Sequence, residues 1–133
     1  MNKNFWIADD DPDDRMIIRE AFEENQFEES LSFFEDGEKV MSKFNEENFD
    51  ENETYPSLLI LDLNMPKVNG LELLQMVKSN AKTKHIPVVI LSTSRNAEDK
   101  VKVLKLGADD FITKPFSFDL MIQITRDLIE KYG

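Results

Sequence analysis

The chain has 133 residues, no cysteine and a formal net charge of −11 at pH 7. Its length suits one domain, so we expect residues 1–133 to form a single unit, and the missing thiols exclude disulfides and thiolate metal sites. The negative charge disfavours nucleic acid and anionic membranes as partners, and no apolar run approaches the roughly 18–20 residues of a membrane span. With no signal peptide evident, we expect a cytoplasmic protein.

Five apolar runs alternate with five stretches of helical spacing. The runs predict strands at residues 4–9, 30–35, 57–62, 87–92 and 109–113. The spacing predicts helices at residues 12–25, 37–46, 70–79, 96–106 and 117–131. Strict alternation is typical of parallel strands with helices on both faces of the sheet. We therefore predict an α/β fold in which a flavodoxin-like, doubly wound sheet of five parallel strands has the order 2-1-3-4-5.

The first helix begins with a run of acidic residues. Asp11 can cap the helix, and Asp13 and Asp14 lie near its positive end, so we expect these three to have a structural role. This role does not explain Asp9 and Asp10, which precede the cap.

Two features mark the connections between elements. Gly107 is expected to end the helix at residues 96–106. The segment Asn45–Tyr55, rich in Glu and Asn, is longer than a typical connection between a helix and a strand. We interpret it as a solvated, mobile insertion.

Polar side chains lie at the carboxyl ends of four predicted strands, where open α/β sheets bind their ligands. The residues are Asp9 and Asp10 after the first strand, Asp62 after the third, Ser92 after the fourth and Lys114 after the fifth. Because the first and third strands are neighbours in the predicted order, we expect the three carboxylates to meet. Their repulsion would raise one or more pKa values unless a cation neutralises them.

A hard divalent cation is the natural partner for such a cluster, because its preferred ligands are oxygens. Mg²⁺ (or Mn²⁺) suits a few carboxylates, a backbone carbonyl and several waters. Asn64 follows Asp62 closely, so that its carbonyl can complete a set with Asp9, Asp10 and Asp62. A calcium-binding EF-hand is excluded, because its characteristic acidic spacing is absent.

The remaining polar residues suit a phosphoryl group. Lys114 offers a positive charge and Ser92 a hydroxyl donor. An ionised Asp62 can itself attack phosphorus and form an aspartyl phosphate, without a general base. Such a reaction needs chiefly in-line positioning and neutralisation of the phosphoryl oxygens.

In this order, the residues resemble the receiver domain of two-component response regulators over essentially the whole chain. The motifs are the Asp9–Asp10 pair, DLNMPKVNG from Asp62, Ser92, and KPF from Lys114. The resemblance implies that Asp62 accepts a phosphoryl group from a histidine kinase. It also implies direct Mg²⁺ ligation by Asp10, Asp62 and the Asn64 carbonyl, with Asp9 acting largely through water.

The resemblance assigns further roles near the phosphate. Lys114 would contact the phosphate, and the Lys114–Pro115 bond is similar to one that is cis in the family. Ser92, where Thr is frequent, would turn its hydroxyl inward to the phosphate. Phe111 would be the aromatic switch, whose rotamer follows the vacated space. It lacks the hydroxyl of the frequent Tyr, so any switching there must be steric.

The implied function is that of a stand-alone response regulator without an output domain. It would catalyse its own phosphorylation and slow dephosphorylation without being a turnover enzyme. It would then signal to an effector or a phosphotransfer protein through a changed surface. The segment Asn45–Tyr55, Asp11-Pro12-x-Asp14 and the run at residues 91–94 are similar to the subgroup associated with phytochrome-type histidine kinases.

The helix at residues 117–131 carries apolar side chains over an arc of roughly 200°, wider than the roughly 100° of an ordinary surface helix. The arc comprises Phe118, Leu120, Met121, Ile122, Ile124, Leu128, Ile129 and Tyr132. We interpret it as part of a contact surface formed with residues 96–106 and 109–113, for a homodimer or a downstream partner. The alternative is an edge helix with ordinary exposed apolar residues.

Two other functions stay open. A phosphatase or phosphotransferase of the haloacid dehalogenase type needs a D-x-D motif, whereas Asp62 is followed by Leu63-Asn64. A receiver-shaped adaptor would bind partners without being phosphorylated. The intact set of Asp9, Asp10, Asp62 and Lys114 argues against that adaptor.

Overall fold

The computed structural model describes residues 4–27, 30–45 and 55–133. The strands are β1 (Asn4–Ala8), β2 (Ser30–Phe34), β3 (Leu58–Leu61), β4 (Val88–Ser92) and β5 (Asp110–Thr113). The helices are α1 (Pro12–Glu24), α2 (Gly37–Phe44), α4 (Gly70–Ser79), α5 (Ala97–Lys105) and α6 (Phe118–Tyr132). Each predicted element is therefore confirmed, with bounds that differ by two residues at most. The expected mobile insertion lies, for residues 46–54, outside the described residues.

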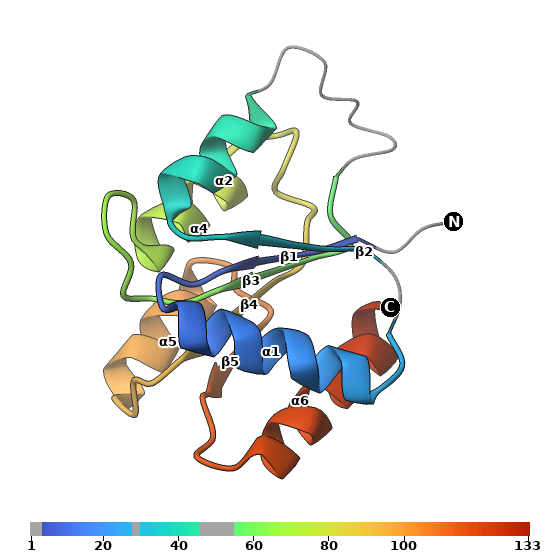
Figure 1. Ribbon diagram of the computed structural model, residues 1–133. Coiled ribbons are helices and arrows are strands. Elements are labelled where there is room, and N and C mark those ends of the chain that lie inside the picture. The colour runs from blue at the N-terminus through green and yellow to red at the C-terminus, as the bar shows by residue number, and fades with distance from the viewer. Residues whose placement is uncertain (1–3, 28–29, 46–54) are drawn as a thin grey trace.

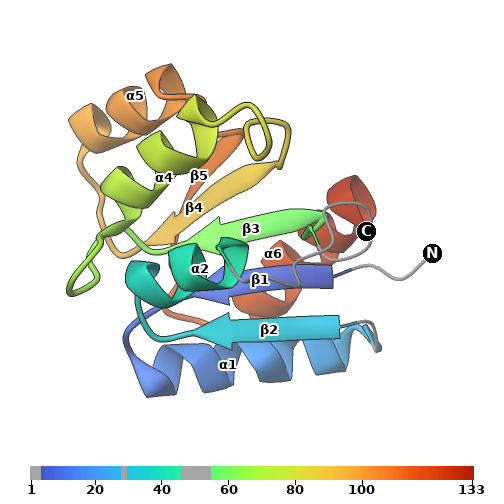
Figure 2. The same cartoon turned by 90° about the horizontal axis from the view of Figure 1, so that it is seen from above.

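The five strands form one parallel sheet in the predicted order β2-β1-β3-β4-β5, and Figure 2 shows them side by side. In register, Trp6 of β1 lies opposite Leu59 of β3, and Ile90 of β4 lies opposite Phe111 of β5. Every residue of β3 and β4 is buried. This is why their sequences are continuous apolar runs rather than alternating ones.

Helices cover both faces of the sheet, and each face has its own hydrophobic core (Figure 1). On one face, Trp6 and Leu59 pack with α2, α4 and α5. On the other, Phe5 and Ile60 pack with α1 and α6. Adjacent residues of a strand thus point to opposite cores, as the pleat of a strand requires.

Local signals set the helix ends as the sequence suggests. The Asp11 side chain accepts a hydrogen bond from the Asp13 N–H and caps α1. Gly107, with φ +106°, follows the C-cap of α5 and ends that helix as predicted. Asn69 caps α4 in a capping box with Glu72, two hydrogen bonds that fix where the chain leaves the loop after β3.

The predicted apolar arc of α6 is divided between the core and the surface. Met121 and Leu128 are buried against the sheet and α1. Leu120 and Phe118 are exposed, and Leu120 leaves 57% of its surface open to solvent. The apolar arc is therefore wide largely because α6 packs against two elements, the sheet and α1.

Among the described helices, none has the length and hydropathy that crossing a bilayer would require.

Candidate functional site

Three carboxylates gather where β1 and β3 end. Ala8 and Leu61 are paired in the sheet, so the residues that follow them, Asp9 and Asp62, lie side by side. Asp9, Asp10 and Asp62 each offer an oxygen, and these oxygens all lie within 4.8 Å of one another. Asp9 and Asp62 are buried, whereas Asp10 is exposed to solvent. The structure thus brings together the three acids selected from the sequence.

Lys114 reaches into this cluster from the end of β5. Its Nζ lies 2.6 Å from Asp9 Oδ2 and 3.2 Å from Asp62 Oδ2. The lysine is buried, and its backbone N–H donates to the Ser92 carbonyl, which ties the end of β5 to the end of β4. One buried ammonium group therefore lies among several carboxylates.

Asp14 is a third carboxylate partner of Lys114, with its Oδ2 at 2.8 Å from Nζ. Sequence reasoning gave Asp14 only a role at the start of α1. The sequence showed that α1 begins shortly after the end of β1, but not which side chain of its first turn reaches Lys114. Arg15 was also missed: its Nη1 donates to the Asp9 carbonyl at 2.7 Å and holds the backbone at the end of β1.

The pKa values of the buried pair reflect this crowding. Burial raises the pKa of Asp9 to about 6, although hydrogen bonds from Lys114 and the Asp11 N–H oppose the rise. Burial alone would lower the pKa of Lys114, but hydrogen bonds to Asp14 and Asp9 and the charge of Asp62 outweigh it. The net shift of the Lys114 pKa is upward, so the lysine stays cationic.

Asn64 lies at the rim of the cluster. Its backbone N–H points to Asp62 Oδ1 at 3.4 Å, a long hydrogen bond that keeps the loop after β3 close to the carboxylate. The residue is exposed. Metal ligation by its carbonyl stays a prediction.

Ser92 is the last residue of β4, and Phe111 lies within the neighbouring strand β5. Ser92 is fully buried, and its Oγ accepts a hydrogen bond from the Ser94 N–H at 3.3 Å. The Ser94 hydroxyl donates in turn to Asp99 of α5. Phe111 is buried in the core on the α4 and α5 side of the sheet. A chain of contacts thus joins the end of β4 to α5, while the switch roles of Ser92 and Phe111 stay predictions.

The Lys114–Pro115 peptide bond is trans, which corrects the cis isomer implied by the resemblance. The preference of a bond before proline for the trans isomer is only about 0.5–1 kcal/mol. A sequence motif alone therefore does not fix the isomer.

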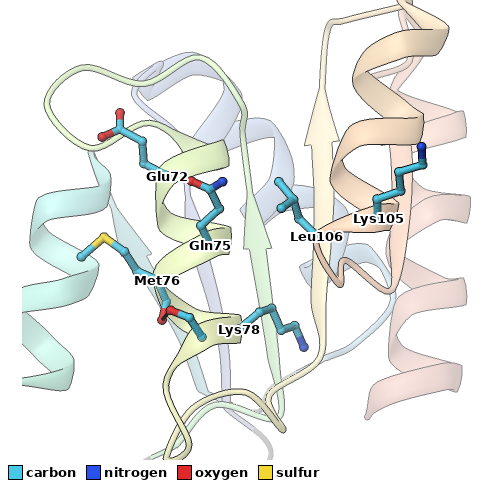
Figure 3. Close-up of a pocket in the computed structure, with 7 residues that line it drawn as sticks. Glu72, Gln75, Met76, Lys78, Lys105 and Leu106 are labelled. Atoms are coloured by element: carbon cyan, nitrogen blue, oxygen red, sulfur yellow. Dashed lines mark hydrogen bonds between the residues drawn. The ribbon is translucent and has the colours of Figure 1, made fainter.

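The structure also has hollows away from the carboxylates. A groove of about 600 Å³ runs between α4 and the end of α5, and Figure 3 shows the side chains that line it. They are Glu72, Gln75, Met76, Lys78, Ser79, Lys105 and Leu106. None of them belongs to the carboxylate cluster. A smaller hollow of about 170 Å³ lies beside Asn64 and Asp99.

The donor set of the cluster fits a hard divalent cation. Its side chains offer carboxylate oxygens only, which Mg²⁺ and Mn²⁺ prefer over nitrogen or sulfur. Two of the acids are buried, and a single lysine provides the positive charge among them. A cation bound by Asp9, Asp10 and Asp62 would neutralise the excess negative charge of the cluster. The same geometry leaves Asp62 beside a fixed ammonium group, as a carboxylate that attacks phosphorus requires.

Comparisons with known proteins point to one family. A family model described as the response regulator receiver domain matches residues 5–126. Response regulator Rcp1 of Synechocystis sp. is 32% identical over 112 residues, which are 84% of this chain and 76% of that protein. The phosphate regulon transcriptional regulatory protein PhoB of Escherichia coli is 32% identical over 117 residues, 88% of this chain but only 47% of PhoB.

Solved structures agree with the sequence relatives. The phosphorylated cyanobacterial phytochrome response regulator RcpA superimposes with a TM-score of 0.88 at 32% identity, covering 99% of this chain and 94% of that chain. The Mn²⁺-bound form of Rcp1 superimposes with a TM-score of 0.82 at 28% identity, covering 95% of this chain and 91% of that chain.

Proposed function

Because the chain belongs to the response regulator receiver domain family, we propose that Asp62 accepts a phosphoryl group from a histidine kinase in a two-component phosphorelay. The observation that carries the proposal is the convergence of Asp9, Asp62 and the buried Lys114, with Nζ at 2.6 and 3.2 Å from the two carboxylates. This arrangement offers a nucleophile, a place for a metal ion and a fixed positive charge. The likeness to regulators named after phytochrome suggests a phytochrome-type kinase as the donor.

We propose Mg²⁺ (or Mn²⁺) as the cofactor, held by Asp9, Asp10 and Asp62 with the Asn64 carbonyl beside them. The oxygen-only donor set and the Mn²⁺-bound structure of the relative Rcp1 support this assignment. When bound, the ion neutralises the carboxylates and the oxygens of the incoming phosphoryl group.

In the proposed transfer, an oxygen of Asp62 forms a bond to phosphorus while the phosphorus–nitrogen bond of the donor phosphohistidine breaks. The donor ring carries a proton on its other nitrogen, so it leaves with the electron pair as a neutral imidazole. The product on this chain is an acyl phosphate. Lys114 donates to a phosphoryl oxygen, and the ionised nucleophile needs no general base.

The proposed signal is a change of surface. The Ser92 hydroxyl turns to the phosphoryl group, Phe111 follows into the vacated space, and the contacts of Ser94 with Asp99 carry the movement to α5. An effector or a phosphotransfer protein reads the changed surface, and slow hydrolysis at Asp62 ends the signal without turnover of other substrates. A histidine kinase as partner also agrees with the cytoplasmic location expected from the sequence.

We further propose that a second copy of the chain binds at the edge of the sheet formed by α5, β5 and α6. Val101 and Leu104 of α5 and Leu120 of α6 are exposed there. The two helices also carry opposite charges: Lys100, Lys102 and Lys105 belong to α5, and Asp119, Asp127 and Glu130 belong to α6. In a twofold-symmetric dimer, α5 of each copy can face α6 of the other and pair these charges.

Incubation with acetyl phosphate and Mg²⁺, followed by intact-mass measurement, tests the main proposal. The wild type should gain the mass of one phosphoryl group, and Asp62→Asn should not. Asp36→Asn is a matched control, because Asp36 is a buried acid that caps α2 and should leave the modification intact. Steady turnover of phosphate esters would favour the phosphatase alternative, and an unmodified wild type would favour the adaptor.

A further inference from the structure

The ammonium group of Lys114 has no free donor. It carries three N–H bonds, and three carboxylates surround it: Asp9 at 2.6 Å, Asp14 at 2.8 Å and Asp62 at 3.2 Å. Asp9 and Asp62 belong to the proposed metal and phosphoryl chemistry. Asp14 does not, because it comes from the first turn of α1 and keeps 30% of its side chain open to solvent.

A phosphoryl group on Asp62 must therefore displace an existing partner of Lys114. The Asp62 oxygen bonded to phosphorus becomes the bridging oxygen of an acyl phosphate, which is a weaker acceptor than a carboxylate oxygen. Asp9 gains a competing cation when the metal binds. Asp14 keeps its full charge and its hold on the ammonium, and it also repels the phosphoryl oxygens.

On the basis of the proposed function, we propose that Asp14 is a positioning residue that holds Lys114 toward α1 and competes with the phosphoryl group for its ammonium. Asp14 thereby slows both the gain and the loss of the phosphoryl group at Asp62. Both reactions pass through a state with charge on the equatorial phosphoryl oxygens, which Lys114 stabilises. Weakening the competitor should accelerate both.

A role at the helix start is separable from this one. Any acid in the first turn of α1 interacts favourably with the helix dipole. Asp13 is such an acid, exposed and without an ion pair in the described part of the chain. Asp13→Asn therefore removes the dipole interaction alone, while Asp14→Asn also removes the charge that holds Lys114.

The experiment follows phosphorylation by acetyl phosphate at saturating Mg²⁺, and then decay after the donor is removed, by intact mass. An oxygen of Asp62 forms the bond to phosphorus, and the phosphorus–oxygen bond to acetate breaks, so that acetate leaves as the anion. We expect both rate constants of Asp14→Asn to rise roughly three- to tenfold over those of Asp13→Asn. Asp13→Asn should match the wild type, and Asp14→Glu, which keeps the charge, should remain slow.

Affinity for beryllofluoride, an anion that mimics a phosphoryl group on a carboxylate, gives a second readout. A purely structural role of Asp14 would leave this affinity unchanged, whereas the proposal expects tighter binding to Asp14→Asn. If the wild type is phosphorylated but both rate constants of Asp14→Asn are equal to or lower than those of the wild type, this inference alone is overturned. A wild type that gains no phosphoryl mass would overturn the proposed function and this inference with it.

Discussion

Asp9 makes the proposed metal site sensitive to pH. Burial raises its pKa from 3.8 to about 6 in the metal-free protein, and a protonated carboxyl group is a poor metal ligand. Below pH 6 a metal ion must displace a proton, so affinity for Mg²⁺ should fall as the pH decreases. We expect binding roughly tenfold weaker at about pH 5 than at about pH 7.5, measured by titration calorimetry.

The matched variant for this prediction is Asp9→Asn, which cannot titrate. It should bind Mg²⁺ more weakly at every pH and with little pH dependence between about pH 5 and 7.5. A wild-type affinity that stays constant over the same interval would contradict the raised pKa.

The individual residues also show what the sequence could and could not predict. Asp9, Asp62 and Lys114 were predictable as neighbours, because each follows a buried strand and parallel strands end at one edge. The contact of Asp14 with Lys114 was not. It depends on how α1 is rotated about its axis and on the reach of a lysine side chain from β5. Neither is encoded in the local spacing of residues.

At the scale of elements, the start of α4 and the end of β3 touch through Gly70. A Cβ built on Gly70 would lie 2.1 Å from the Asp62 carbonyl oxygen, which is backbone and has little room to move. Gly70→Ala should therefore destabilise the fold by about 1–3 kcal/mol or more. It should also weaken Mg²⁺ binding, since the backbone that carries the Asp62 carboxylate must shift. Urea unfolding and calorimetry measure the two effects.

Ser79→Ala provides the control for this variant, because Ser79 is exposed at the other end of α4. It should change neither quantity noticeably. Full Mg²⁺ affinity in a folded Gly70→Ala protein would show that the close approach does not position Asp62.

Asn25 joins α1 to α6. Its Nδ2 donates to the Ile122 carbonyl and the Thr125 hydroxyl at 2.9 and 2.8 Å, and its Oδ1 accepts from Arg126. Asn25→Ala removes the side-chain hydrogen bonds that join α1 to α6, so we expect a loss of about 1–3 kcal/mol in the free energy of unfolding. Gln123→Ala, which removes only an exposed hydrogen bond on α6, should cost clearly less. Equal losses of unfolding free energy in the two variants would show that Asn25 does not hold α1 against α6.

The elements themselves were predictable almost to the residue. Strands β3 and β4 are short, buried and apolar throughout, and Asp11 and Gly107 are residues suited to helix ends. The division of the apolar arc of α6 between core and surface was not predictable, and the contact surface stays a proposal. Met121 and Leu128 face the core because α6 packs on α1 as well as on the sheet, and the width of an apolar arc does not say which of its side chains become buried.

At the scale of the whole molecule, β5 connects the carboxylate site to the proposed dimer face. The carboxylate cluster and Lys114 lie at the ends of β1, β3 and β5, and β5 is one of the two edge strands of the sheet, flanked by α5 and α6. A change at Lys114 or Phe111 is therefore made on the strand that borders the proposed dimer face. Phosphorylation can strengthen association there only if the face differs between the two states.

If β5 transmits the change at Asp62 to the proposed dimer face, beryllofluoride and Mg²⁺ should strengthen self-association, measured by sedimentation equilibrium. Val101→Lys adds a positive charge to a face of α5 that already carries Lys102 and Lys105, in a hollow of about 380 Å³. It should weaken the dimer roughly tenfold or more, because the added charge must be desolvated beside like charges. Met16→Lys is the control, because Met16 lies on α1 and is exposed like Val101; it should leave association unchanged.

Added salt should weaken the wild-type dimer, since the proposed pairs between α5 and α6 are exposed and therefore screened. A wild type that stays monomeric with beryllofluoride would exclude the second copy and leave a downstream partner as the occupant of this face.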